Sequence, residues 1–189
     1  MRYILASKSP RRKELMKFIS SDFLVAVEDI DEESSYLLPP IEAVKDIAKR
    51  KGKAIDSLYP DDLIISADTI VVLDNEIIGK PKDKEDAKRI LRMLSNKSHY
   101  VYTAYRVKYI NKEIINYVES EVIFNKLDKD LIDRYVESGS PLDKAGAYGA
   151  QDNNDFPIVK KVIGSFDNVI GFPVKEIKED IDKIISSCG

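Results

Sequence analysis

The residues best suited to chemistry lie in and around an apolar segment near the middle of the chain. Asp68 and Thr69 follow apolar residues 63–67, and a turn at residues 74–75 leads on to Lys80. A strand that ends at Asp68 and Thr69 would present both side chains at the carboxyl edge of a sheet, where α/β proteins bind ligands. If the turn brings Lys80 back beside Asp68, the pair combines a base or metal ligand with a cation for phosphate.

This segment also has a structural interpretation, in which Asp68 only caps a turn. Apolar residues 70–72 follow directly, however, so Asp68 does not stand in an obvious solvent loop. Gly79 would let the backbone approach closely, and Pro81 would stiffen the exit from the turn. We therefore favour a functional role for Asp68 and Lys80.

Residues 7–12 (SKSPRR) form a second candidate site, suited to an anion. Ser9 fits the N-cap, and Pro10 the first turn, of a helix over residues 9–19. Free amides at a helix N-terminus favour a negative ligand, and the guanidinium of Arg12 can hold phosphate at two points. The alternative is a capped surface helix with exposed arginines. Two arginines at the positive end of a helix dipole are mildly unfavourable, which favours a site that needs positive charge.

Two further groups of charged residues allow both kinds of interpretation. Asp31, Glu32 and Glu33 could form a solvated turn or supply an oxygen ligand to a hard cation. Lys51 lies late in a predicted helix over residues 40–58, among many other lysines, so its surroundings favour a solvated side chain.

Residues 140–157 are rich in Gly, Pro, Asp and Asn and predict a long loop, which overlaps the segment SGSPLDKAGAYGAQ (138–151). Loops of this length are more often functional than idle. Small residues surround Tyr148 and Gln151. The amide of Gln151 both donates and accepts, which suits recognition of a base edge, whereas the alternative is a flexible surface loop. His99 is the only histidine, and its place at the start of a strand favours a structural role.

Alternating strands and helices must position these side chains, which predicts a single α/β domain over residues 1–189 with a mixed sheet. An antiparallel ribbon with a turn at residues 111–112 should separate its two ends. Short strands are predicted over 3–6, 22–29 and 63–67, short strands or turns over 156–164 and 168–173, and helices over 9–19, 40–58, 83–95, 128–139 and 173–186.

The composition narrows the classes of function. The chain has 189 residues, 43% hydrophobic and 33% charged, with a net charge of −3, which fits a globular protein and argues against a nucleic-acid scaffold. Cys188 is the only cysteine, so neither a disulfide within the chain nor a cysteine zinc site is expected. The sequence contains no membrane-spanning apolar run and neither of the common phosphate-loop motifs, and we expect a cytoplasmic protein.

Taken together, seven segments closely resemble the Maf family of nucleoside triphosphate pyrophosphatases, once called septum formation inhibitors. They follow the family order from residue 5 to residue 174, which is nearly the whole chain. The segments are LASKSPRRKELM (5–16), DIDEE (29–33), IAKRKGKA (47–54), ISADTIVVLDNEIIGKPKD (65–83), SHYVYTAYRV (98–107), SGSPLDKAGAYGAQ (138–151) and NVIGFPV (168–174).

The resemblance implies a fold and an activity. The fold would be α/β of the Maf/ITPase-like kind, an elongated mixed sheet flanked by helices, with two lobes and a central cleft. The activity would be hydrolysis between the α and β phosphates, giving a nucleoside monophosphate and pyrophosphate with a divalent cation, Mg²⁺ or Mn²⁺. The motifs look like those of the branch acting on dTTP and UTP, with modified pyrimidine nucleotides as further candidates. Family members often form homodimers.

The resemblance also implies roles for individual residues. Asp68 matches the proposed proton acceptor, with Lys80 and Glu32 beside it in the catalytic set, and Glu32 and Asp68 would complete the metal site. Arg11, Thr69 and Gln151 would select the base. The remaining polar lining of the cleft matches Ser7, Arg12 and Lys51.

This chain departs from the family pattern at two places. The residue after Gln151 is Asp152 where family members usually have glycine, and Gly52 stands where alanine is usual. Two rival functions remain open: a non-catalytic nucleotide-binding regulator of cell division and septum formation, and a phosphatase or sugar-nucleotide enzyme that uses the same anion-binding turn.

Overall fold

The computed structural model describes residues 1–188, in which it contains seven strands, six α-helices and four short 3-10 helices. The strands are β1 (Tyr3–Leu5), β2 (Phe23–Val25), β3 (Leu63–Leu73), β4 (Glu76–Ile78), β5 (Ser98–Tyr109), β6 (Lys112–Phe124) and β7 (Val159–Ile163). The α-helices are α1 (Pro10–Met16), α2 (Pro40–Lys53), α3 (Lys84–Leu94), α4 (Lys129–Glu137), α5 (Phe166–Ile170) and α6 (Val174–Ser186), and the 3-10 helices are η1 (Glu33–Leu37), η2 (Ser140–Asp143), η3 (Ala145–Ala147) and η4 (Ala150–Asn154).

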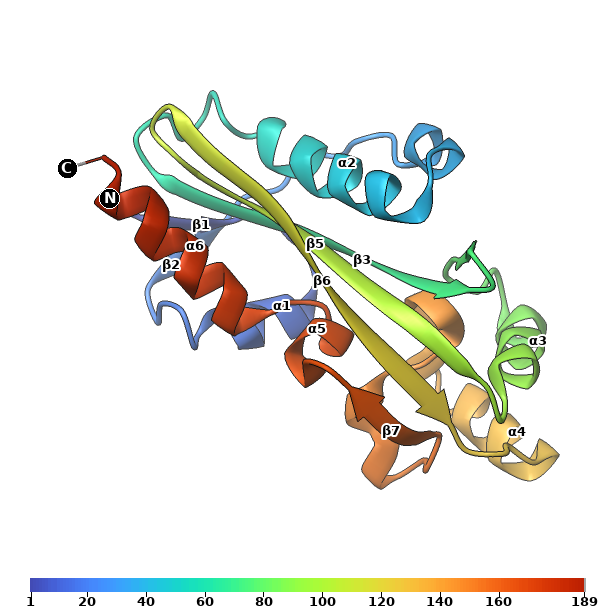
Figure 1. The fold of residues 1–189 in the computed structure, drawn as a ribbon. Helices are drawn as coiled ribbons and strands as arrows, with labels where there is room; N and C mark the ends of the chain where they lie inside the picture. Colours follow the sequence, from blue (N-terminus) through green and yellow to red (C-terminus); the bar gives the residue numbers. More distant parts are fainter. Residues whose placement is uncertain (189) are drawn as a thin grey trace. The chain divides into compact units, whose positions relative to one another are not determined.

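The strands form one mixed sheet in the order β2-β1-β3-β5-β6-β7, and β4 pairs with β3 (Figure 1). β1 runs parallel to β2 and β3, whereas β4 is antiparallel to β3 and β7 is antiparallel to β6. The predicted α/β class with a mixed sheet is therefore confirmed. The turn at Asp74 and Asn75 is also confirmed, since both residues have positive φ as a tight hairpin requires.

The chain folds into two compact units. The first unit contains Met1–Thr69, Thr103–Val118 and the residues from Gly171 onward, and the second contains Ile70–Tyr102 and Glu119–Ile170. Strands β3, β5 and β6 contribute residues to both units.

In the first unit, α2 and α6 pack on opposite faces of the sheet. Tyr105 of β5 donates a hydrogen bond to Asp180 of α6 at 2.7 Å, whereas its neighbour Arg106 binds Asp56, just after α2, at 2.8 Å. Successive side chains of a strand point to opposite faces, so these contacts place the two helices on different sides.

Gly52 of α2 lies where the buried side chain of Arg106 passes under the helix. A Cβ at Gly52 would lie 2.6 Å from Ser66 Oγ and 2.8 Å from Arg106 Nη1. Arg106 is 2% exposed and forms ion pairs with Asp56 and Glu113, so it cannot move away cheaply. The glycine is a packing requirement of this chain rather than a weak point in the helix.

The second unit has its own apolar core between the strands and helices α3 and α4. The aromatic part of this core joins His99, Phe124 and Tyr148, whose rings meet edge to face with centroids 4.7–5.4 Å apart. His99 is 1% exposed and its Nε2 hydrogen-bonds the hydroxyl of Tyr148 at 2.8 Å, in agreement with the structural role expected for it.

Several expectations about local structure are wrong. β3 does not end at Asp68 and Thr69 but continues to Leu73, because residues 70–73 stay buried and pair onward with β4. Residues 166–170 form the helix α5 rather than a strand or a turn. A Cβ at Gly79 would meet no atom within 4 Å, so close approach does not explain that glycine.

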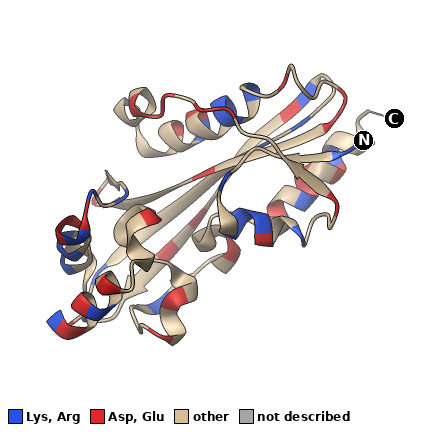
Figure 2. Cartoon of the chain, turned by 180° about the vertical axis from the view of Figure 1, so that it is seen from behind, with Lys and Arg blue, Asp and Glu red and all other residues tan. Residues whose placement is uncertain are grey.

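Charged residues of both signs alternate along the helices, whereas the sheet is largely uncharged (Figure 2). In the part of the chain that the structure describes, no helix is long and apolar enough to cross a membrane. Cys188 has an exposed thiol.

Candidate functional site

The turn between β1 and α1 is built as the sequence predicts. The side chain of Ser9 accepts a hydrogen bond from the backbone N–H of Arg12 at 3.4 Å, and Pro10 is the first residue of α1. The buried hydroxyl of Ser7 accepts in turn from the N–H of Ser9 at 3.2 Å. This cap fixes the direction in which the residues of the first helical turn leave the backbone.

Arg12 is held inside the first unit and is not the exposed arginine of the structural alternative. Its Nε donates to the carbonyl of Gly171 at 2.8 Å, Nη2 to Thr69 Oγ1 at 3.0 Å and Nη1 to Ser7 Oγ at 3.4 Å. Burial lowers the pKa of Arg12, and the negative charge of Asp68 opposes that shift. Because a guanidinium carries five N–H donors, Arg12 keeps donors for an incoming oxygen.

Thr69 lies between Arg12 and a residue that the sequence analysis missed, Thr103. The hydroxyls of Thr69 and Thr103 are 2.8 Å apart and share a hydrogen bond. Gly171 was missed as well: its φ is +117°, and a Cβ there would lie 3.1 Å from Thr69 Oγ1. A signal existed for Thr103, since it is a polar residue among the buried positions of β5.

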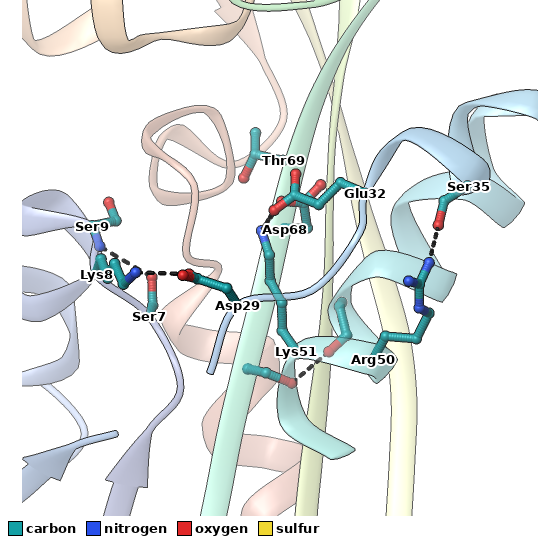
Figure 3. A network of polar contacts seen from close by, with 12 residues as sticks. Ser7, Lys8, Ser9, Asp29, Glu32, Ser35, Arg50, Lys51, Asp68 and Thr69 are labelled. Carbon is teal, nitrogen blue, oxygen red and sulfur yellow. Dashed lines mark hydrogen bonds and ion pairs between the residues drawn. The ribbon is translucent and has the colours of Figure 1, made fainter. Parts of the chain in front are cut away.

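A cluster of three charged side chains lies beside this set, formed by Glu32, Lys51 and Asp68 (Figure 3). The ammonium of Lys51 is 2.8 Å from Asp68 Oδ1 and 2.8 Å from Glu32 Oε1. The side chain of Lys51 is only 21% exposed, so the solvated interpretation of this lysine is wrong. We call these three residues the Lys51 cluster.

Asp68 keeps one oxygen available within the Lys51 cluster. The residue is 7% exposed, and its Oδ2 is buried with no hydrogen-bond partner in the described structure. A buried carboxylate oxygen without a donor is costly, so this atom is suited to a ligand that the structure does not contain.

Glu32 reaches the Lys51 cluster because the segment around it is fastened to α2. Arg50 donates to Ser35 Oγ (Figure 3). Arg50 also donates to the carbonyl of Asp31, and Ser35 Oγ donates to Asp46 Oδ2 at 2.7 Å. Of the three consecutive acids, Glu32 alone turns inward, while its two neighbours are exposed. Glu32 therefore differs from its two neighbours by its contact with Lys51, and its role as a cation ligand stays a prediction.

Tyr36 is a further residue that the sequence analysis did not single out. Partial burial, together with the negative charges of Asp68 and Glu32, raises the pKa of Tyr36 to about 12. Its hydroxyl therefore stays protonated at neutral pH.

The residues fit a divalent cation that draws part of its coordination from a ligand. The carboxylates of Glu32 and Asp68 surround one cationic position, which the ammonium of Lys51 holds in this structure. Mg²⁺ is typically bound by one or two carboxylates together with phosphate oxygens and water. Within residues 1–188, no three His, Cys, Asp or Glu side chains are grouped closely enough to hold a metal ion by themselves.

Six of the predicted site residues therefore fall into two sets. Ser7, Arg12 and Thr69 form one hydrogen-bonded set, and Glu32, Lys51 and Asp68 form the Lys51 cluster; both lie in the first unit, with Asp68 and Thr69 adjacent on β3. Arg11 is half-buried in the first turn of α1. Lys80 and Gln151 are exposed in the second unit, and their meeting with Asp68 stays a prediction.

The fold and these sets define a class of protein: α/β proteins that place a carboxylate pair, a shared lysine and a half-buried arginine around one interior strand. The family model described as Maf-like protein matches residues 2–184, and the chain belongs to this family.

Curated relatives agree with this assignment over nearly the full length of the chain. A protein of Clostridium botulinum (strain Alaska E43) is 42% identical over 98% of this chain and 100% of its own, and one of Symbiobacterium thermophilum is 40% identical over 90% and 88%. A protein of Acholeplasma laidlawii is 39% identical over 94% of each chain. All three are named dTTP/UTP pyrophosphatase.

Proposed function

We propose that this chain hydrolyses nucleoside triphosphates, preferentially dTTP and UTP, to the nucleoside monophosphate and pyrophosphate. Membership of the Maf family and the names of the relatives support the reaction class. The observation that carries the proposal is the Lys51 cluster, where one ammonium is shared at 2.8 Å by the carboxylates of Asp68 and Glu32. Such a set offers a base, a cation site and a phosphate-binding cation together.

In the proposed reaction, Asp68 orients a water molecule toward the α-phosphorus and accepts its proton. The unpartnered Oδ2 of Asp68 is the atom suited to this contact. Carboxylates are weak bases at neutral pH, so orientation and charge neutralisation supply most of the acceleration. Pyrophosphate leaves from the opposite side of the phosphorus.

Positive groups balance the charge of the triphosphate. Lys51 and Arg12 are already confined by their neighbours, and Lys80 joins them as a third cation in our proposal. Confinement matters because a preorganised cation loses little freedom when the transition state forms. Ser7 would contribute at the anion-binding turn.

The cofactor in this proposal is Mg²⁺ or Mn²⁺, held by Glu32 and Asp68. When bound, the ion would neutralise negative charge on the phosphates. The ion would draw on the same two carboxylates that Lys51 contacts, so the ammonium would compete with it.

Base selection is assigned to Arg11, Thr69 and Gln151. Thr69 and Gln151 carry groups that can donate and accept, and Arg11 donates, which together suits the carbonyls and ring N–H of thymine and uracil. Modified pyrimidines with the same polar edge are further candidate substrates.

The cytoplasmic location and the homodimer expected from the family resemblance belong to the same proposal. The net charge of −3 argues against a nucleic-acid partner. Size-exclusion chromatography with light scattering tests the dimer directly.

A panel of canonical and modified nucleoside triphosphates tests the proposed function. Purified protein and Mg²⁺ or Mn²⁺ should release pyrophosphate and a monophosphate, most rapidly from dTTP or UTP. Binding of nucleotides without any product would favour the non-catalytic regulator of cell division. Release of inorganic phosphate or transfer of a sugar would favour the phosphatase or sugar-nucleotide enzyme.

A further inference from the structure

The side chain of Gln151 is exposed, but the residue that follows it is firmly attached to the second unit. Asp152 Oδ2 accepts hydrogen bonds from the hydroxyl of Tyr135 at 2.7 Å and from Ser140 Oγ at 2.6 Å. Tyr135 belongs to α4 and Ser140 to η2, so one carboxylate oxygen joins η4 to two other elements.

The backbone before Gln151 is attached to the same tyrosine. The hydroxyl of Tyr135 accepts from the N–H of Gly149 at 2.9 Å while it donates to Asp152. A Cβ at Gly149 would lie 2.5 Å from Gln151 Nε2 and 2.8 Å from Lys144 Cε, so the amide of Gln151 packs over this glycine. Tyr135 thus bridges the residues on either side of the turn that presents Gln151.

The chemical state of these groups suits a fixed linkage. Tyr135 is fully buried, and burial together with the hydrogen bond to Asp152 raises its pKa, so the hydroxyl stays protonated and donates. Asn153 adds a third attachment, because its side chain exchanges hydrogen bonds of 2.7 and 3.0 Å with the backbone of Val159 in β7.

We propose that Asp152, through Tyr135 and Ser140, positions Gln151 and thereby sets which nucleotide base the enzyme accepts. The inference rests on the proposed function, because it assigns Gln151 to base recognition. Asp152 is a positioning residue: its own carboxylate is engaged with Tyr135 and Ser140. A glycine at this position, as the family resemblance would lead one to expect, could form neither hydrogen bond.

The test uses the full-length enzyme with kcat and KM measured for dTTP, UTP, ATP and GTP. In Asp152→Ala and Tyr135→Phe, the KM for the preferred pyrimidine should rise about tenfold, the size expected for losing a hydrogen bond to a charged group. The kcat should stay within about twofold, because the groups around Asp68 are untouched. The preference for pyrimidine over purine nucleotides should fall accordingly.

A double-mutant cycle separates positioning from a general loss of order. In a Gln151→Ala background, Asp152→Ala should change base preference by less than about twofold, since the side chain that it positions is gone. If the fold-changes of the two single substitutions instead multiplied in the double variant, the two residues would act independently and the inference would be overturned. Asp155→Ala is the matched control, because Asp155 is an exposed acid in the same loop, and it should leave base preference unchanged.

Further outcomes test this inference and distinguish its failure from that of the proposed function. If Asp152→Ala fails to fold by circular dichroism, Tyr135→Phe and Ser140→Ala each remove one hydrogen bond to Asp152 and should still raise the KM. Unchanged base preference in Tyr135→Phe and Ser140→Ala, in an enzyme that hydrolyses dTTP or UTP, overturns this inference alone. A wild-type protein that releases no pyrophosphate from any triphosphate overturns the proposed function and this inference with it.

Discussion

Lys51 in the first unit and Tyr135 in the second each join two partners, but with different kinds of bond. Lys51 binds two carboxylates through a full positive charge, and each contact is 2.8 Å long. Tyr135 uses a neutral hydroxyl that donates to Asp152 and accepts from the N–H of Gly149. Lys51 is itself a candidate ligand for the phosphates, whereas Tyr135 lies behind the candidate residue Gln151.

The difference follows from what each region has to do in the proposed reaction. Charged partners can be exchanged. An incoming cation can replace the ammonium that a carboxylate binds, and an incoming phosphate can replace the carboxylate that an ammonium binds. Buried neutral groups have no such replacement, since an unpaired hydroxyl or amide costs free energy in the interior. The first region is therefore built to rearrange on binding, and the second to stay fixed.

The largest expected effect is that of Asp68→Asn. Turnover should fall by at least about a thousandfold, because an amide cannot accept a proton from water, while nucleotide binding should persist. Single-turnover pyrophosphate release and isothermal titration with dTTP measure the two quantities. Asp62→Asn is the control, since Asp62 is another buried carboxylate with a cationic partner, Arg2 at 2.6 Å, outside the site. Near-normal turnover in Asp68→Asn would reject its role as base.

Lys51→Met should lower turnover by about a hundredfold, because a preorganised phosphate ligand is lost. It should also tighten Mn²⁺ binding in the absence of nucleotide, by about tenfold, since no ammonium then competes for Glu32 and Asp68. Electron paramagnetic resonance of free Mn²⁺ gives the affinity. The control is Lys53→Met on the exposed side of the same helix. Equal or weaker Mn²⁺ binding in Lys51→Met would show that the ammonium and the metal do not share a position.

The buried His99 in the core of the second unit should make stability depend on pH. Burial lowers the pKa of His99 from 6.5 to about 4, so below pH 6.5 the unfolded chain binds a proton that the folded chain does not. Neutral His99 therefore makes its full contribution to stability above about pH 6.5. The free energy of unfolding decreases as the pH falls, by about 2 kcal/mol at pH 5. Urea unfolding of wild type and His99→Gln at several pH values measures this. If both proteins have the same pH slope, the buried histidine is not its source.

The smallest effect concerns base selection itself. Gln151→Ala and Arg11→Trp should change the ratio of kcat/KM values between dTTP and a purine triphosphate by about tenfold, with little change in kcat. Competition between two substrates in one reaction gives this ratio directly. An unchanged ratio in both variants would show that neither residue selects the base. The linkage through Tyr135 would then have no role in base selection.

Much of the fold follows from the local conformational preferences of individual residues, which can be recognised in the sequence. The helix beginning at Pro10 and the end of α4 before Gly139, whose φ is +78°, depend on one or two residues with strong conformational preferences. The continuation of β3 past Asp68 was not predicted. A polar residue suggests the end of a buried strand, but it can lie within one when another side chain binds it. Lys51, from a distant segment, is the partner of Asp68, and no local sequence pattern predicts this contact.

The candidate site divides in the same way. Asp68, Arg12 and Ser9 could be recognised from their place at a strand or a helix terminus. Lys51 was misjudged from its neighbours, since its burial depends on a tertiary contact with Glu32 and Asp68. In the sequence, Asp152 stood out only as a departure from the family pattern, and only the positions of Tyr135 and Ser140 show what its carboxylate binds.

The exposed thiol of Cys188 has a practical consequence for studying this enzyme. The chain contains one cysteine, so a maleimide dye will attach to a single place, at the end of α6 in the first unit. A second cysteine introduced on the solvent side of α4 would complete a donor and acceptor pair. Energy transfer between the two dyes would then report, molecule by molecule, whether adding nucleotide changes their separation.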